Sequence, residues 1–121
     1  MKYLLSILFV FSAFFLQAQN IFKSLAAQDL SSITKLLGEE TDLCLLDDQE
    51  ILSKNEVVKK LSSFLATIKP KSCEKVHSGN SVGNRSNYSL GKLITADNQA
   101  YRVFIFAEED ETIKEIRIDR W

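Results

Sequence analysis

Apolar residues recur every three or four positions between residues 21 and 37, a spacing typical of one face of a helix. Gln28-Asp29 interrupts this stretch. Asp29 is suited to cap a second short helix, because its carboxylate can accept hydrogen bonds from the free amides that follow. Gly38 is the expected end, since glycine commonly follows the last turn of a helix. The pattern predicts a helical start to the folded domain.

The next apolar segment, Asp42 to Leu46, is short and runs into acidic residues, which indicates a strand followed by a solvated turn. Ile51-Leu52 is expected to begin a partner strand. A capping box follows at Ser53-Lys54-Asn55-Glu56 and predicts a helix through Ile68. Lys69-Pro70 is expected to end this helix, because proline disfavours helical geometry in the residue before it.

After Pro70 apolar residues alternate with polar ones, and this period of two is typical of strands. The turn-forming residues between the alternating segments divide them into short elements. No repeat and no linker-like composition marks a second domain. We therefore predict an antiparallel meander of four strands, at Ser72 to His77, Asn87 to Thr95, Ala100 to Ala107 and Ile113 to Arg120.

Asp97-Asn98 is expected to form a two-residue hairpin turn, because both residue types tolerate positive φ. A similar turn is expected at Glu109-Asp110. The predicted partners are Ile94 with Tyr101, Lys92 with Val103, Leu90 with Ile105, Ile116 with Val103, and Ile118 with Tyr101. In this register one face forms the core. Its members are Tyr88, Leu90, Ile94, Tyr101, Val103, Ile105, Ile116 and Ile118.

The opposite face of the predicted sheet carries three large apolar side chains, Leu93, Phe104 and Phe106. Beside them run charged residues of the neighbouring strands, which include Arg102 and Glu115. Large exposed apolar patches tend to be contact surfaces. Two explanations remain open: a homodimer that forms through this face, or a loop of the same chain that covers it. We favour the homodimer, because little chain remains to act as cover.

The amino terminus has the three parts of an export signal: Lys2, the apolar run Leu4 to Leu16, and the boundary Gln17-Ala18-Gln19. A membrane-spanning helix needs about 20 apolar residues, so an uncleaved anchor is the weaker alternative. We therefore predict a signal peptide at residues 1–18 and a single domain at residues 19–121. The mature chain is expected in the periplasm or outside the cell.

The formal net charge is −1, and charged residues of both signs are spread along the chain, which argues against nucleic acid as a partner. A domain of about 100 residues can build one core without a metal or disulfides. An oxidising compartment allows Cys44 and Cys73 to pair. The alternative is that each is a buried thiol that packs as a small hydrophobe.

The order of helices, strand, capped helix and meander resembles the nuclear transport factor two-like fold, also described as cystatin-like. This α+β fold is a strongly curved antiparallel sheet wrapped around two or three helices. The chain is similar to a family of secreted bacterial proteins of unknown function with this fold. The matching residues are Leu43 to Asp47, Ser53 to Ile68 with Lys69-Pro70, His77-Ser78-Gly79, Tyr88-Ser89-Leu90-Gly91 and Tyr101-Arg102-Val103. The sequence departs from the family at Gln28-Asp29, where a glycine-containing turn is common.

The resemblance implies that the first strand pairs with the last and that the third lies at the far edge, which separates Cys44 from Cys73. It also implies a cavity between the helices and the inner sheet face, where enzymes of this fold hold their catalytic groups. The candidate ligand-binding residues on that face are Tyr88, Lys92 and Tyr101. Tyrosines on a strand face are more often core residues, and the predicted face offers no carboxylate.

The sequence contains no phosphate loop, zinc-binding CxxC pair, HExxH, GxSxG or dinucleotide fingerprint. His77 is the only histidine, so a histidine-based metal site has little to draw on. We expect no cofactor and no metal. The favoured hypothesis is a non-catalytic exported module that binds a small apolar ligand or associates with itself through Leu93, Phe104 and Phe106. The alternative is a cofactor-free lyase or isomerase acting on a small hydrophobic substrate.

Overall fold

The computed structural model describes residues 21–80 and 87–121, so the predicted signal peptide lies outside the described residues. No helix within these two ranges is long and apolar enough to cross a membrane. The described elements follow one another as α2 (Ile21–Ala27), α3 (Leu30–Leu36), β1 (Leu37–Leu45), β2 (Asp48–Ser53), α4 (Lys54–Ile68), β3 (Pro70–Asn80), β4 (Asn87–Thr95), β5 (Ala100–Ala107) and β6 (Ile113–Arg120).

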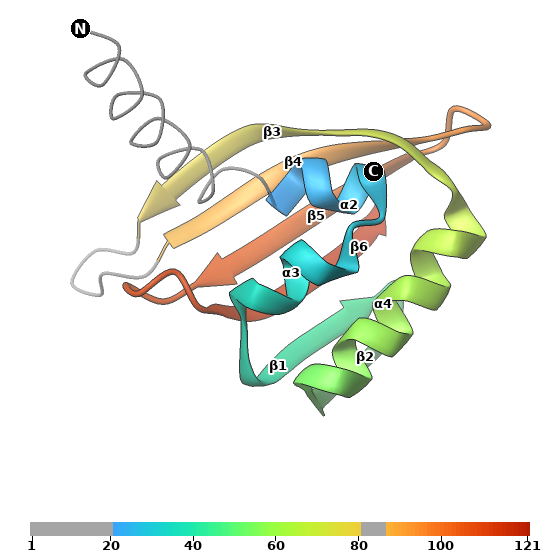
Figure 1. Cartoon of the computed structure of the whole chain (residues 1–121). Coiled ribbons are helices and arrows are strands. Elements are labelled where there is room, and N and C mark those ends of the chain that lie inside the picture. The colour runs from blue at the N-terminus through green and yellow to red at the C-terminus, as the bar shows by residue number, and fades with distance from the viewer. Residues whose placement is uncertain (1–20, 81–86) are drawn as a thin grey trace, which may run out of the picture.

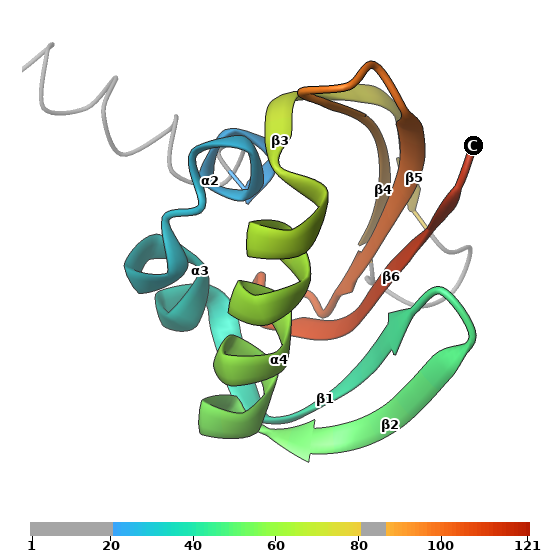
Figure 2. The same ribbon diagram turned by 90° about the vertical axis from the view of Figure 1, so that its right-hand side faces the viewer.

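The strands form one curved sheet in the order β2-β1-β6-β5-β4-β3 (Figure 1). The predicted meander from β3 to β6 is confirmed, and so is the implied pairing of the first strand with the last. The β1–β6 pair is parallel and the other pairs are antiparallel, so the sheet is mixed. Helices α2, α3 and α4 lie on one face, here called the inner face (Figure 2). Among the described residues no helix covers the opposite, outer face.

The core fills the space between the helices and the inner face. Val57, Leu61 and Leu65 occur at every fourth position of α4 and are fully buried, as one face of a helix requires. They belong to a single apolar cluster with residues of every strand and of the other two helices. Phe64 is half-buried at the edge of the cluster, where its ring meets Tyr101 edge-on at 6.2 Å. Side chains therefore occupy the part of the fold that lies beneath α4.

The helix ends agree only in part with the sequence signals. The Asp29 carboxylate caps α3 by accepting hydrogen bonds from the Ser32 amide (3.2 Å) and hydroxyl (2.7 Å), as expected. Ser53 occupies the N-cap of α4, but its side chain makes no capping hydrogen bond. Lys69 ends α4 with a left-handed φ of 53°, directly before Pro70. The prediction for Gly38 is wrong: α3 ends at Leu36, and Gly38 already belongs to β1.

The predicted two-residue turn at Asp97-Asn98 is wrong by one residue. Thr95 and Gln99 close a three-residue loop, in which the Thr95 amide donates to the Gln99 carbonyl (2.9 Å) and Asn98 takes a φ of 64°. Such loops commonly contain one left-handed residue. Ile94 therefore pairs with Ala100 instead of Tyr101. A one-residue slip moves every side chain of a strand to the other face.

This slip reverses the predicted faces of β4. Gly91, Leu93 and Thr95 are buried on the inner face, whereas Tyr88 and Lys92 lie on the outer face. The predicted placement of Leu93 in an outer patch is therefore wrong, as is the placement of Tyr88, Leu90, Lys92 and Ile94 on the core face. On β5 and β6 the register differs from the prediction by two residues, with Ile105 opposite Ile116 and Val103 opposite Ile118. A shift of two preserves the faces, so the core assignment of these four residues is confirmed.

Candidate functional site

A cavity of about 210 Å³ opens where the ends of β3, β4 and β5 meet α2 and α3. We call it the end cavity. Its apolar side comes from α2, α3, β5 and β6. The apolar lining residues are Ile21 of α2, Leu36 of α3, Ile105 and Ala107 of β5, and Ile113 of β6. This floor exists because β5 and β6 keep their apolar residues on the inner face up to the end of the sheet.

Polar residues form the other side of the end cavity. They are Lys75, Ser78, Asn87, Tyr88, Ser89 and Glu111, and Gly79 also lines the cavity. Lys75 and Glu111 are exposed, so their charged groups stay in contact with water. A volume below about 300 Å³ is smaller than that of most drug-sized ligand sites. The arrangement suits a small molecule whose apolar part enters and whose polar part faces the solvent.

The three candidate ligand-binding residues are not brought together. Tyr88 borders the end cavity, although it belongs to an outer-face position of β4. Tyr101 lies on the inner face at the opposite end of the sheet, beside a second hollow of about 540 Å³ next to the end of α4. Lys92 lies on the outer face near Trp121, at 4.9 Å from the centre of the indole ring.

The sequence reasoning missed most of the cavity lining. Lys75 and Glu111 belong to no motif, Ser78 and Ser89 were noted only for the family resemblance, and the four meet because β3, β4 and the turn before β6 converge. The usable signal was their position at the ends of predicted strands, where side chains are less often needed for the core. Ser78 and Ser89 are partners on neighbouring strands, so a correct register would have placed them side by side.

The outer face carries a cluster of rings that we call the aromatic patch, formed by Tyr88, Phe104 and Phe106. The Tyr88 ring stacks on Phe104 at 6.2 Å with an interplanar angle of 19°. His77 lies next to it, with Nε2 at 3.3 Å from the Tyr88 hydroxyl. Phe106 is the strand partner of Tyr88. The predicted outer position of the two phenylalanines is thus correct, and Tyr88 takes the place expected of Leu93.

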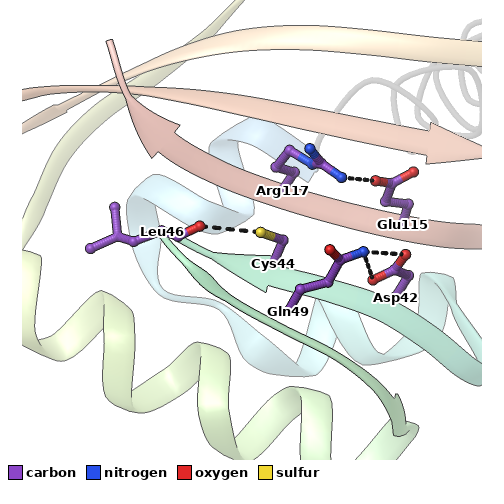
Figure 3. Close-up of polar contacts among 6 residues, drawn as sticks. All are labelled: Asp42, Cys44, Leu46, Gln49, Glu115 and Arg117. Atoms are coloured by element: carbon purple, nitrogen blue, oxygen red, sulfur yellow. Dashed lines mark hydrogen bonds and ion pairs between the residues drawn. The ribbon is translucent and has the colours of Figure 1, made fainter.

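A polar network continues the outer face across β2, β1 and β6 (Figure 3). The Gln49 amide donates to both carboxylate oxygens of Asp42 at 3.1 Å, and Arg117 pairs with Glu115 at 3.0 Å. Cys44 lies between these groups and donates to the Leu46 carbonyl at 3.2 Å (Figure 3). Burial raises the pKa of the Cys44 thiol, an effect that the nearby Arg117 charge opposes. These contacts give the polar groups of this network a structural role in the sheet.

The described residues hold few buried groups that can exchange a proton. None of the buried side chains in residues 21–80 and 87–121 is Asp, Glu, His, Lys or Arg. Burial raises the pKa of Cys73 to about 12, so this thiol stays protonated at neutral pH. Cys44 and Cys73 lie on β1 and β3, with β6, β5 and β4 between them. Within the described ranges no group of three or more His, Cys, Asp or Glu residues is arranged to hold a metal.

Several solved structures share the fold. A DUF4783 family protein from Bacteroides ovatus superposes on this chain with a TM-score of 0.74 and 19% sequence identity. The superposition covers 84% of this chain and 93% of that chain. A protein of unknown function with a cystatin-like fold from Methylobium petroleophilum superposes with a TM-score of 0.62 and 8% identity, over 82% of this chain and 69% of that chain. A putative ketosteroid isomerase from Kribbella flavida superposes with a TM-score of 0.57 and 13% identity, over 87% of this chain and 78% of that chain. At these identities the likeness shows the fold alone, which is the nuclear transport factor two-like fold that the sequence predicted.

Curated protein sequences give no significant match to this chain. The Bacteroides ovatus protein belongs to the DUF4783 family, and the sequence profile of that family also matches this chain. The match covers residues 18–119, which is nearly the whole predicted domain. The resemblance to a bacterial family of unknown function is therefore confirmed, and the chain belongs to the DUF4783 family, described as a domain of unknown function.

Proposed function

We propose that the protein is a non-catalytic binding module that holds a small, largely apolar ligand in the end cavity. The observation that carries the proposal is the division of the cavity into an apolar floor and a solvated polar rim. Burial of apolar ligand surface against Ile105 and Ile113 supplies the affinity, at roughly 25 cal/mol per Å² removed from water. The rim groups orient the polar end of the ligand.

Catalysis of the lyase or isomerase type would need a different cavity. Such chemistry requires a general base in an apolar setting, where desolvation brings its pKa near the working pH. In the end cavity the charged side chains, Lys75 and Glu111, are exposed. The space beneath α4 is filled by side chains. These two features support the binding module over the enzyme.

A short fatty acid and its neutral amide are the probes that test the cavity. Titration of the full chain with hexanoate and with hexanamide, followed by NMR, is expected to shift the amides of Ser89, Ile105 and Ile113. Ala107→Phe adds a ring at the cavity wall and is expected to abolish binding. Ala100→Phe, the same change at the other end of β5, is expected to leave it intact. Equal binding by both variants, or shifts that avoid the cavity, would contradict the proposal.

We also propose export, from the apolar run at residues 4–16 and the Gln17-Ala18-Gln19 boundary. The exported chain is expected to start at Gln19 or Asn20, which intact-mass spectrometry measures. Recovery of a full-length chain embedded in the membrane would contradict this part of the proposal.

A second candidate role, self-association, is favoured by the outer face. The aromatic patch lies there, and two further apolar residues of the same face are exposed, Ile51 at 71% and Trp121 at 53%. Charged residues border the patch on β6, as in the polar rim of a protein interface. A pairing of two copies centred on the aromatic patch would bury its rings, and sedimentation of the mature chain measures it directly.

A further inference from the structure

Trp121 is held against the outer face just beyond β6. Its backbone amide donates to the Ala100 carbonyl at 3.1 Å, which continues the ladder between β5 and β6 by one residue. Its side chain remains 53% exposed, although large aromatic residues usually gain much by burial. The sheet thus fixes the position of an indole ring whose surface is largely open to solvent.

Two cations from neighbouring strands converge on this ring. Lys92 Nζ lies 4.9 Å and Arg102 Cζ 5.2 Å from the centre of the indole. Lys92 and Arg102 are direct partners on β4 and β5, so the register brings both side chains to the same place. Ring faces attract cations through their negative quadrupole. The indole therefore contacts two positively charged side chains of neighbouring strands.

Neither cation forms a direct ion pair among the described residues, although each has an acidic residue as a strand partner. Glu74 is the strand partner of Lys92, and Asp119 is the strand partner of Arg102. The ion pairs found among the described residues involve other lysines and arginines. Two cations that contact one ring repel each other, and salt screens this repulsion only in part. An anion that contacts both groups would relieve it.

The donors present match an oxyanion. Lysine and arginine together offer several N–H groups and no acceptor, and the indole adds one more N–H. Hydrogen bonds between such cations and carboxylate, sulfate or phosphate oxygens are among the stronger ones in proteins. Arg102 is exposed and Lys92 half-exposed, so a ligand reaches both. The chemistry is that of anion recognition at a solvent-accessible surface.

We propose that Lys92, Arg102 and Trp121 form a binding site for a small oxyanion, the carboxylate, sulfate or phosphate group of a ligand. This site lies at the other end of β4 and β5 from the end cavity, and it does not depend on the proposed function. The two cations bind the anion, and the indole holds them in place.

The test uses the fact that Trp121 is the only tryptophan of the chain, so its fluorescence reports on this site alone. Sodium sulfate, sodium phosphate and sodium acetate are titrated separately into the full chain, each against sodium chloride at equal ionic strength. A saturable change in emission with at least one of the oxyanions is expected, and comparison of the three identifies the preferred group. Isothermal titration calorimetry supplies a second measurement that does not depend on the indole.

Substitutions decide whether the two cations are responsible. Lys92→Gln and Arg102→Gln are each expected to weaken binding about tenfold or more, since each removes a charge-assisted hydrogen bond. Arg117→Gln is the control, because this arginine lies on the same face but pairs with Glu115. A response equal to that of chloride, or one unchanged in the Lys92→Gln/Arg102→Gln double variant, would show that the cations only cover the indole and would overturn the proposal.

Discussion

The ring of Phe22 on α2 occupies the space that a side chain at Gly91 of β4 would need. A Cβ atom at Gly91 would lie 2.5 Å from Cδ1 and from Cε1 of that ring, and 3.2 Å from the Glu74 carbonyl oxygen. Both Phe22 and Gly91 are buried. The first described helix can approach the sheet closely only because β4 has no side chain at this point.

Gly91→Ala is therefore expected to destabilise the fold by about 1–3 kcal/mol, the usual cost of an added methyl group in a packed core. The measurement is urea denaturation followed by circular dichroism. Gly38→Ala is the control, since its Cβ would meet the Thr112 methyl group at 3.0 Å, at a half-buried position of β1 where a side chain can adjust. Equal losses in the two variants would show that Phe22 is not the obstacle.

We expect the substitution Thr→Val to affect the free energy of unfolding differently at two threonines that are equally buried. Thr41 and Thr95 are each 1% exposed. The Thr41 hydroxyl has no hydrogen-bond partner, whereas the Thr95 hydroxyl contacts Asp97 and accepts from the Gln99 amide at 2.9 Å. Thr41→Val is expected to leave the free energy of unfolding unchanged or raise it by up to about 1 kcal/mol. Thr95→Val is expected to lower it by about 1–2 kcal/mol, because it leaves the loop groups unpaired.

Denaturant titration of both variants checks this pair of predictions. Valine and threonine have nearly the same shape, so a change of packing contributes little to the difference. A large loss in Thr41→Val would indicate that its hydroxyl has a partner in solution, such as a buried water.

The caps of α3 and α4 give a prediction on pH. Hydrogen bonds from Ser32 hold the pKa of Asp29 below the ordinary aspartate value of 3.8. A carboxylate with a lowered pKa in the folded state contributes stability that is present above its unfolded pKa and is lost as the pH falls through the folded value. Asp29→Ala is therefore expected to destabilise the domain at pH 7 and to have little effect well below pH 3.8.

Ser53→Ala is the comparison for Asp29→Ala, since Ser53 occupies the N-cap of α4 without a capping hydrogen bond. It is expected to change stability little at either pH. Thermal denaturation at the two pH values measures both variants. An Asp29→Ala loss that does not depend on pH would place the effect outside the ionised carboxylate.

The sequence predicted the elements well because local signals mark them. Asp29 caps a helix, Lys69-Pro70 ends one, and alternating residues define β4, β5 and β6. The faces of β4 were not predictable in the same way. Asp97-Asn98 is compatible with loops of two or three residues, and the choice between them decides which side of the sheet Leu93 occupies.

The long-range features required more than periodicity. The parallel pairing of β1 with β6 joins segments far apart in the chain, and only the family resemblance implied it. The end cavity was not predicted residue by residue, because Lys75, Ser89 and Glu111 come from different elements and carry no shared motif. Their meeting depends on the register between neighbouring strands, which the alternation of apolar and polar residues does not determine by itself.

We predict that two copies of the chain associate through the aromatic patch of the outer face. A two-fold interface brings the same surface of each copy together, so Phe104 of one copy would lie near the patch of the other. Phe104→Glu places a charge among Tyr88 and Phe106, and burying an unpaired carboxylate is costly. The dissociation constant of the dimer is expected to rise at least about tenfold. Sedimentation of the mature chain across a concentration series measures it.

The control for Phe104→Glu is Ala66→Glu, which adds the same carboxylate at an exposed position of α4, on the other side of the sheet. It is expected to leave the dissociation constant unchanged. Because Phe104 also stacks on Tyr88, circular dichroism must first show that the Phe104→Glu variant is folded. A folded wild-type chain that stays monomeric up to high micromolar concentration would refute self-association. The aromatic patch would then be explained by cover from the same chain, the alternative that the sequence left open.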